Sequence, residues 1–101
     1  MPEEKTASVL TVQLSGEYDI ARTAELRAAL LGDHQDEHEV VADLKSVTFM
    51  DSTGLRSLLE VRAELERRGA AFRVINPGPM IVRLFDISGT TEIFGLPGRE
   101  S

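Results

Sequence analysis

The chain has 101 residues, of which 42% are hydrophobic, and this is the length and composition of one ordinary globular domain. Its 17 acidic and 11 basic residues give a formal net charge of −6, which opposes binding to nucleic-acid phosphates, and the absence of cysteine excludes disulfides and thiolate metal sites. The charged start MPEEKTA and the short apolar stretches predict neither a secretion signal nor a membrane span, so we expect a cytoplasmic protein.

The first half of the chain predicts two strands with a helix between them. Residues 8–14 (SVLTVQL) are rich in β-forming side chains and indicate a strand that runs into a turn at Gly16. Residues 21–31 repeat apolar side chains at helical spacing, and Gly32 ends the pattern. Residues 39–44 (EVVADL) are almost continuously apolar, which is typical of a strand covered on both faces. The apolar face of the helix is formed by Leu26, Ala29 and Leu30.

The second half of the chain repeats this order. Residues 52–68 predict a helix, residues 71–76 (AFRVIN) predict a strand, and Pro79 is well placed to begin a third helix that ends at Gly89. Residues 91–94 (TEIF) predict a last short strand. The apolar sides of the two helices are expected to consist of Leu55, Leu58, Leu59, Val61 and Leu65, and of Ile81, Leu84 and Phe85.

Strands and helices that alternate in this way specify a parallel sheet with right-handed crossovers. In such sheets, functional surfaces gather at the carboxyl ends of the strands, where the helices begin. The stretch DSTG, residues 51–54, occupies one of these places. It holds a carboxylate and two hydroxyls where one capping residue would be sufficient, which raises the question of a second role.

Two interpretations of this stretch remain open from the residues themselves. Asp51 or Ser52 can cap the following helix by accepting a backbone N–H bond, a role in which aspartate and serine are common. Alternatively, a hydroxyl here accepts a phosphoryl group, which would lie against backbone N–H donors left free at the helix start and against the positive end of the helix dipole. The two roles can coexist.

Four motifs together resemble a known family. They are LSGEYD, EVVADL, VTFMDSTGL and NPGPMIVRLFDISG, and the similarity runs from about Val9 to Phe94. In this order they are similar to the STAS domain of bacterial anti-sigma factor antagonists. The resemblance implies a single STAS domain over residues 1–101, with its core at about 8–96. The implied fold is of the α/β class, a small, mostly parallel β-sheet with helices packed on one side.

The resemblance also implies a regulatory function rather than an enzyme activity. Unphosphorylated family members bind an anti-sigma factor that is also a serine kinase, and so free its sigma factor. Phosphorylation of the serine that follows the motif's aspartate breaks this complex, and a serine phosphatase restores it. In this chain that serine is Ser52, and Thr53 is the neighbouring hydroxyl from which it must be distinguished. The chain would then be a substrate of the kinase, without a cofactor of its own and monomeric when free.

A second version of the implied function keeps the same fold but has no phosphorylation switch. The chain would then be a constitutive STAS interaction module in a transport or stressosome-like complex, and Ser52 would only cap a helix. The two versions differ in whether a charge on Ser52 changes partner binding.

The partner-binding surface is expected around the DSTG motif. The GEYD stretch, residues 16–19, should emerge from the first strand at the same edge of the sheet, although an ordinary solvated turn is an equal alternative. Arg56, Ser57 and Glu60 are placed on the polar side of the second predicted helix, where an ordinary solvent-facing role is the commoner alternative to partner contact. Relatives commonly have a small residue at Arg56, and a cation there could pair with a phosphate or change which kinase fits. The expected partner-binding residues are Glu17, Tyr18, Asp19, Asp51, Ser52, Thr53, Gly54, Arg56, Ser57 and Glu60.

The stretch GDHQDEHE, residues 32–39, holds two histidines among acidic residues. A histidine pair at i and i+4, here His34 and His38, can bind zinc when it lies on a helix. Because the stretch follows the end of a predicted helix, we interpret it as a solvated acidic loop, with metal binding as the less favoured alternative. The sequence contains no phosphate-binding glycine loop and no recognisable nucleophile with its base, so we predict no catalytic site.

Overall fold

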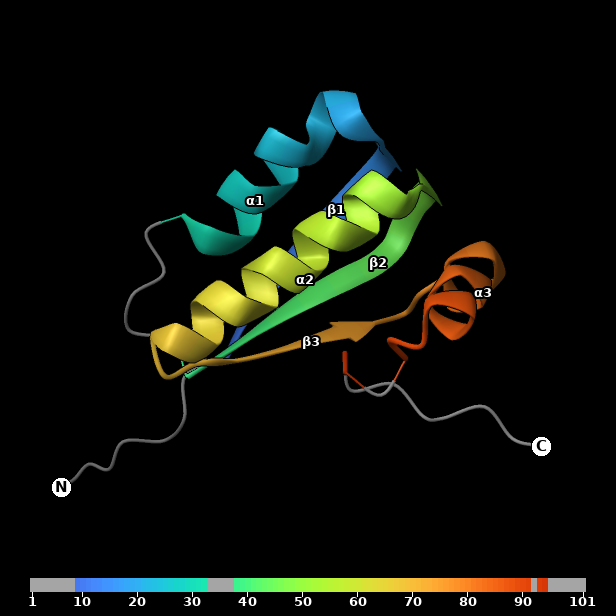
Figure 1. Cartoon of the computed structure of the whole chain (residues 1–101). Coiled ribbons are helices and arrows are strands. Elements are labelled where there is room, and N and C mark those ends of the chain that lie inside the picture. The colour runs from blue at the N-terminus through green and yellow to red at the C-terminus, as the bar shows by residue number, and fades with distance from the viewer. Residues whose placement is uncertain (1–8, 33–37, 92, 95–101) are drawn as a thin grey trace, which may run out of the picture.

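The computed structural model describes residues 9–32, 38–91, 93 and 94. Three strands and three α-helices alternate along these residues, and one 3-10 turn precedes the first helix (Figure 1). In chain order the elements are β1 (Val9–Tyr18), η1 (Ile20–Arg22), α1 (Thr23–Leu31), β2 (Glu39–Met50), α2 (Ser52–Arg67), β3 (Ala71–Ile75) and α3 (Pro79–Ser88).

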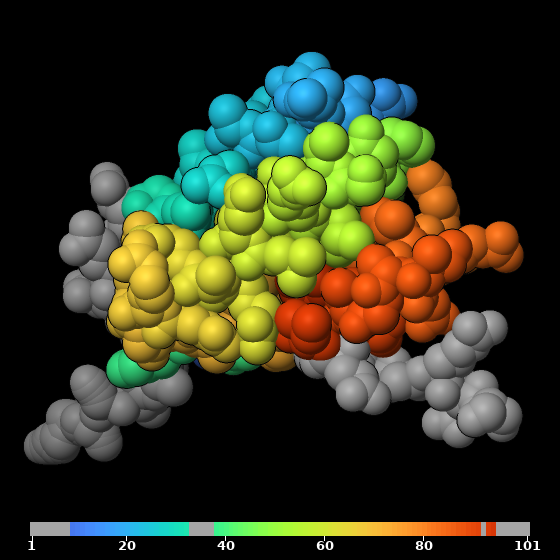
Figure 2. Space-filling model, in the orientation of Figure 1, coloured from blue at the N-terminus to red at the C-terminus, as the bar shows by residue number. Residues whose placement is uncertain are grey.

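The strands form a parallel sheet in the order β1-β2-β3. Because each strand is added beside the previous one in the same direction, right-handed crossovers place α1 and α2 on the same face of the sheet. Figure 1 shows these two helices side by side over the strands, with α3 beside the carboxyl end of the sheet, and in Figure 2 the atoms of α1 lie directly against those of α2. The predicted small parallel sheet with helices on one side is confirmed.

The core lies between the sheet and the helices. The helix side chains that the apolar patterns predicted are buried or pack against the core as partly buried groups. Such burial removes apolar area from water and stabilises the fold by about 25 cal/mol per Å². The strands contribute Leu14, Val40, Ala42, Leu44, Phe72 and Val74, and the helices contribute Leu26, Leu30, Leu55, Leu58, Val61, Leu65, Ile81 and Phe85. Ala29, Leu59 and Leu84 are the partly buried members of the predicted set.

The two long strands extend beyond their predicted ends, because they stay paired as far as Tyr18 and Met50. Gly16, where a turn was predicted, lies inside β1 with a φ of +82°, a conformation that favours glycine. The pairing register shifts once before and once after this glycine, and at each shift β2 has one residue more than β1. Such an irregularity bends a strand pair without separating it. The predicted turn is therefore wrong: this glycine accompanies a strand irregularity, and the chain does not reverse there.

The prediction of a last strand at residues 91–94 is also wrong, as far as the structure describes these residues. Thr91, Ile93 and Phe94 lie in turns, and the carbonyl oxygen of Phe94 accepts one hydrogen bond, 2.9 Å long, from the Val74 amide of β3. The ring of Phe94 is fully buried, edge-on to Phe72 and 5.0 Å from the ring centre of Phe85. The Phe94 side chain thus closes the core beside β3, although its backbone forms no strand ladder with β3.

Candidate functional site

The candidate site lies where the carboxyl ends of β1 and β2 meet the start of α2 (Figure 1). The backbone amide of Asp51 donates a 3.3 Å hydrogen bond to the carbonyl oxygen of Tyr18, so the last residue of β1 contacts the residue that precedes α2. The 3-10 turn η1 follows immediately after β1 and also contacts α2. The structure therefore brings the GEYD and DSTG stretches together at one edge of the sheet.

Asp51 is the N-cap of α2. Its backbone is extended, and its Oδ1 accepts hydrogen bonds from the amides of Thr53, at 2.9 Å, and Gly54, at 3.2 Å. The Thr53 hydroxyl donates to the same oxygen at 2.5 Å. This hydroxyl, followed by the two amides, lowers the pKa of the Asp51 carboxyl, so the group is ionised at neutral pH. Of the two possible caps, aspartate has this role, and Ser52 is the first helical residue.

The two neighbouring hydroxyls differ in availability. The side chain of Ser52 is exposed and has no hydrogen-bond partner among the described residues. Thr53 is half-buried, and its hydroxyl is engaged by Asp51. A kinase approaching this edge would therefore meet the hydroxyl of Ser52 and not that of Thr53.

The backbone donors at the start of α2 are mostly occupied. Asp51 accepts from the amides of Thr53 and Gly54 through its side chain, and from the amide of Leu55 through its carbonyl oxygen, at 3.0 Å. We expected a phosphate on Ser52 to lie against free amide donors at this helix start. The structure corrects that expectation for three of these donors, because the carboxylate of Asp51 holds the amides of Thr53 and Gly54 and its carbonyl oxygen holds that of Leu55.

Gly54 brings α2 into close contact with the strand ends. A Cβ atom at this position would lie 2.7 Å from Met50 Cγ and 2.8 Å from the carbonyl oxygen of Tyr18, closer than real Cβ contacts. The residue is buried accordingly. Glycine is thus required by a close approach, and the start of α2 is held against the end of β1.

The Gly54→Ala variant is expected to be about 1–3 kcal/mol less stable than the parent in chemical denaturation, because the added methyl overlaps a backbone carbonyl. In an open helix the same change would be favourable. Gly78→Ala is the matched control, since a Cβ at Gly78 has no atom within 4 Å, and it should stay within about 1 kcal/mol. A Gly54→Ala variant as stable as the parent would contradict the close contact.

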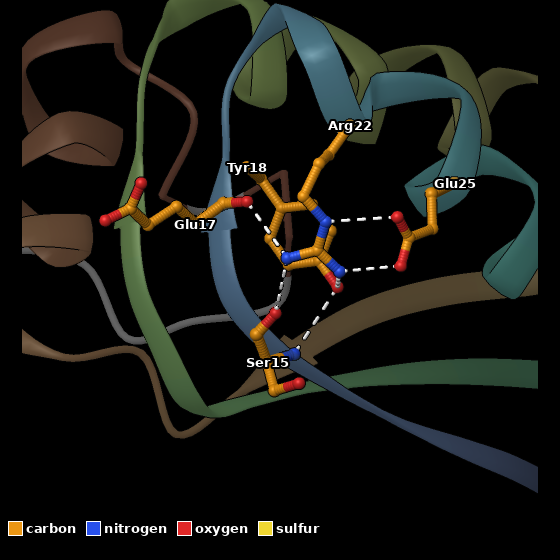
Figure 3. Close-up of polar contacts among 5 residues, drawn as sticks. All are labelled: Ser15, Glu17, Tyr18, Arg22 and Glu25. Carbon is orange, nitrogen blue, oxygen red and sulfur yellow. Dashed lines mark hydrogen bonds and ion pairs between the residues drawn. The ribbon is translucent and has the colours of Figure 1, made fainter.

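A cluster of contacts around Arg22, the Arg22 cluster, holds the end of β1 in place (Figure 3). The Arg22 guanidinium lies over the Tyr18 ring, 4.3 Å from its centre, and donates from Nη1 to the carbonyl oxygens of Ser15, at 2.9 Å, and Glu17, at 3.1 Å. Its Nε and Nη2 donate to the carboxylate of Glu25, at 3.1 and 2.7 Å. These contacts join the irregular part of β1 to η1 and α1, and the hydrogen bonds from Arg22 lower the pKa of Glu25.

The sequence-based prediction missed this role of Arg22. The detectable signals are its spacings, four residues after Tyr18 and three before Glu25, which suit a cation–π contact and a helix-surface ion pair. Tyr18 itself is only 3% exposed, so its side chain is not at the surface where the partner-contact prediction required it. Its ring faces the core because the strand continues through Gly16.

The remaining candidates from GEYD lie at the surface. Glu17 is exposed, and Figure 3 shows its carboxylate pointing away from the Arg22 cluster. Asp19 is half-buried and caps η1, with its Oδ1 accepting from the Ala21 amide at 3.0 Å. Ile20, which the sequence-based prediction missed, is 75% exposed on η1 beside the start of α2. It places an apolar side chain on the same edge as Ser52.

The three candidates further along α2 have different environments. Ser57 is 4% exposed, so its prediction on the polar side is wrong; it lies one turn after Gly54 on the buried side. Glu60 is exposed but forms an ion pair with Arg27 of α1, about 12 Å along the helix axis from Ser52. Arg56 is exposed, one turn from Ser52, and has no hydrogen bond or ion pair among the described residues.

Two further expectations concern a membrane and a metal. In the part of the chain that the structure describes, no helix combines the length and the apolar composition that a bilayer crossing requires. Within the same residues, no three histidine or acidic side chains are grouped as metal ligands would be. The histidine-rich stretch lies mostly outside them, because residues 33–37 are not described, so its interpretation as a solvated loop stays a prediction.

Comparison with known proteins identifies relatives over most of the chain. The family model of the STAS domain matches residues 2–100. The anti-sigma F factor antagonist of Paenibacillus polymyxa is 33% identical over 100 residues, which cover 96% of this chain and 85% of that protein. An anti-sigma factor antagonist is thus among the proteins similar to this one in sequence.

Two solved structures have the same fold. The anti-sigma factor antagonist SpoIIAA in its unphosphorylated form matches with a TM-score of 0.67 and 26% identity, over 86% of this chain and 77% of that one. A sulfate transporter family protein from Wolinella succinogenes matches with a TM-score of 0.74 and 18% identity, over 90% of this chain and 76% of that one. At 18% identity the second match shows a likeness of fold alone.

Proposed function

Because the chain belongs to the STAS domain family, we propose that it is an anti-sigma factor antagonist that is switched by phosphorylation of Ser52. In this function the unphosphorylated chain binds an anti-sigma factor that is also a serine kinase, and the sigma factor held by that kinase is released. The observation that carries the proposal is the position of Ser52. Its free hydroxyl stands at the surface directly after the capping aspartate, in a chain similar to anti-sigma factor antagonists over most of its length.

The proposed contact area, which we call the switch surface, combines charged, polar and apolar groups at one sheet edge. It consists of Glu17, Asp19, Ile20, Ser52 and Arg56, all at least partly exposed. Ile20 supplies an apolar side chain that a partner can bury, while the charged members supply orientation. A hydroxyl at the centre of such an area is desolvated when the partner docks.

Phosphorylation would change this surface electrostatically. The phosphate adds about −1.5 to −2 charges at neutral pH, so the net charge of the chain would pass from −6 to about −8. The ionised Asp51 lies next in sequence, and Glu17 and Asp19 lie on the same edge. A docked partner would have to bury this dianion beside other negative charges, which is unfavourable without a matching cation. Phosphorylation therefore breaks the complex, and a serine phosphatase reverses the change.

The catalytic groups for phosphoryl transfer belong to the kinase in this proposal. Such transfer needs bound nucleotide, magnesium ions and a residue that accepts the hydroxyl proton. The chain would supply only the acceptor hydroxyl of Ser52, at a place where the kinase can reach it. It is accordingly a substrate and a binding protein.

Incubation with ATP, magnesium and each anti-sigma kinase encoded in the same genome tests the proposal. We expect mass spectrometry to find phosphate on Ser52, no label on the Ser52→Ala variant, and a retained label on Thr53→Val, which keeps the side-chain shape but lacks the hydroxyl. This pattern follows from the exposed Ser52 hydroxyl and the bonded hydroxyl of Thr53. Phosphate on Thr53, or no phosphate with any of these kinases, would refute the phosphorylation switch.

A further inference from the structure

A phosphate on Ser52 would need a positive partner that the helix start does not provide. Asp51 already accepts from the amides of Thr53 and Gly54, and its carboxyl, whose pKa these bonds lower further, is negatively charged at neutral pH. The dianion would therefore lie beside a carboxylate, and the amides of Thr53, Gly54 and Leu55 are already bonded to Asp51. A cation from elsewhere on the chain would have to balance it.

Arg56 is placed to be that cation. It lies four residues after Ser52 on α2, and side chains of a helix lean towards its N-terminus, so residue i+4 reaches back over residue i. Its side chain is exposed, and no described residue bonds to it. An arginine can hold a phosphate with two parallel N–H bonds, which is stronger and more directional than a single contact.

The other arginines nearby are engaged. Arg22 is held by Glu25, and Arg27 is held by Glu60, the carboxylate that would otherwise compete for Arg56 from the next turn of α2. Four more described arginines form ion pairs with glutamates, namely Arg62, Arg67, Arg68 and Arg73. Arg56 and Arg83 of α3 are the described arginines outside these pairs, and Arg56 is the one that lies one helical turn from the exposed hydroxyl.

We propose that Arg56 is the intramolecular ligand of the phosphate on Ser52, an inference that rests on the proposed function. The guanidinium turns towards the phosphate when Ser52 is modified and binds it against the first turn of α2. Phosphorylation then changes two groups of the switch surface at once, because it adds a dianion and withdraws a cation that the free form offers to its partner. The structure of the helix itself is unchanged.

The test measures the ionisation of the phosphate in chains that carry phosphoserine at position 52, introduced during translation so that no kinase is needed. Phosphorus NMR titration gives the second pKa of the phosphate, which is near 6 without neighbours. A bound guanidinium favours the dianion, so the parent should show a lower pKa than Arg56→Gln, by about 0.4 pH unit. The Arg56→Lys variant should recover part of this difference, and high salt should reduce it.

The matched control is Arg67→Gln, which removes the same charge about 22 Å away at the other end of α2. It should leave the phosphate pKa at the parent value. Equal pKa values in the parent and in Arg56→Gln would overturn the proposal, as would an equal shift in the control. Since the phosphoserine is installed without a kinase, this outcome is separate from the labelling experiment, and either proposal can fail alone.

Discussion

Replacement of Ser52 by aspartate is expected to weaken binding to the anti-sigma kinase about a hundredfold, whereas Ser52→Ala should bind like the parent. The hydroxyl is exposed and makes no bond among the described residues, so its removal leaves no buried group unsatisfied. A carboxylate at the same place adds a charge next to the ionised Asp51 and must be desolvated on docking. A hundredfold loss corresponds to about 2.8 kcal/mol, which one uncompensated charge at an interface can supply.

Titration calorimetry of the two variants with the kinase measures this effect. The matched control is Ser46→Asp, which adds the same charge at an exposed serine of β2, four residues before the strand ends. It should bind within a few-fold of the parent. If Ser52→Asp, Ser52→Ala and the parent all bind with equal affinity, the switch is refuted and a constitutive interaction module is the better description.

The position of the site followed from the order of elements. Alternating strands and helices predicted a parallel sheet, and DSTG between a strand and a helix predicted a place at its carboxyl edge; the fold bears out both. The helix faces were also predictable, because Leu55, Leu58 and Leu65 recur at helical spacing and the structure buries them. These features depend on local pattern and on the handedness of crossovers, which a sequence carries directly.

The orientation of single side chains at the edge was less predictable. Tyr18 is buried because β1 stays paired with β2 through two register shifts. These shifts depend on the extra residues that β2 has on either side of the position paired with Gly16. Ser57 is buried although its residue type suggested a polar face, since it follows Gly54 on the side of α2 that faces the core. Strand irregularities and close helix contacts are tertiary effects, and residue type or short-range spacing does not report them.

Which side chain accepts from the backbone amides at the start of α2 could not be predicted either. The sequence offered Asp51 and Ser52 as equivalent caps, and only the geometry assigns the bonds to Asp51 and Thr53. That assignment reverses the electrostatic expectation for a phosphate, since the helix start presents a carboxylate to it.

Phe94→Ala is expected to cost about 3–5 kcal/mol of the free energy of unfolding, the usual range for loss of a fully buried phenylalanine. Its ring contacts Phe72 of β3 edge-on and Phe85 of α3 at 5.0 Å, so truncation leaves a cavity between two elements. Because small domains are stable by only about 5–15 kcal/mol, this is a large fraction of the total. Urea denaturation followed by circular dichroism measures it.

The adjacent residue provides the control for that truncation. Ile93 is 39% exposed, and Ile93→Ala should lower the free energy of unfolding by less than about 1 kcal/mol. Because neighbouring side chains of a strand also point to opposite faces, this comparison tests which of the two side chains the core holds. A large loss at Phe94 with a small loss at Ile93 identifies Phe94 as the buried anchor between β3 and α3. Equal losses would contradict the burial that the structure shows.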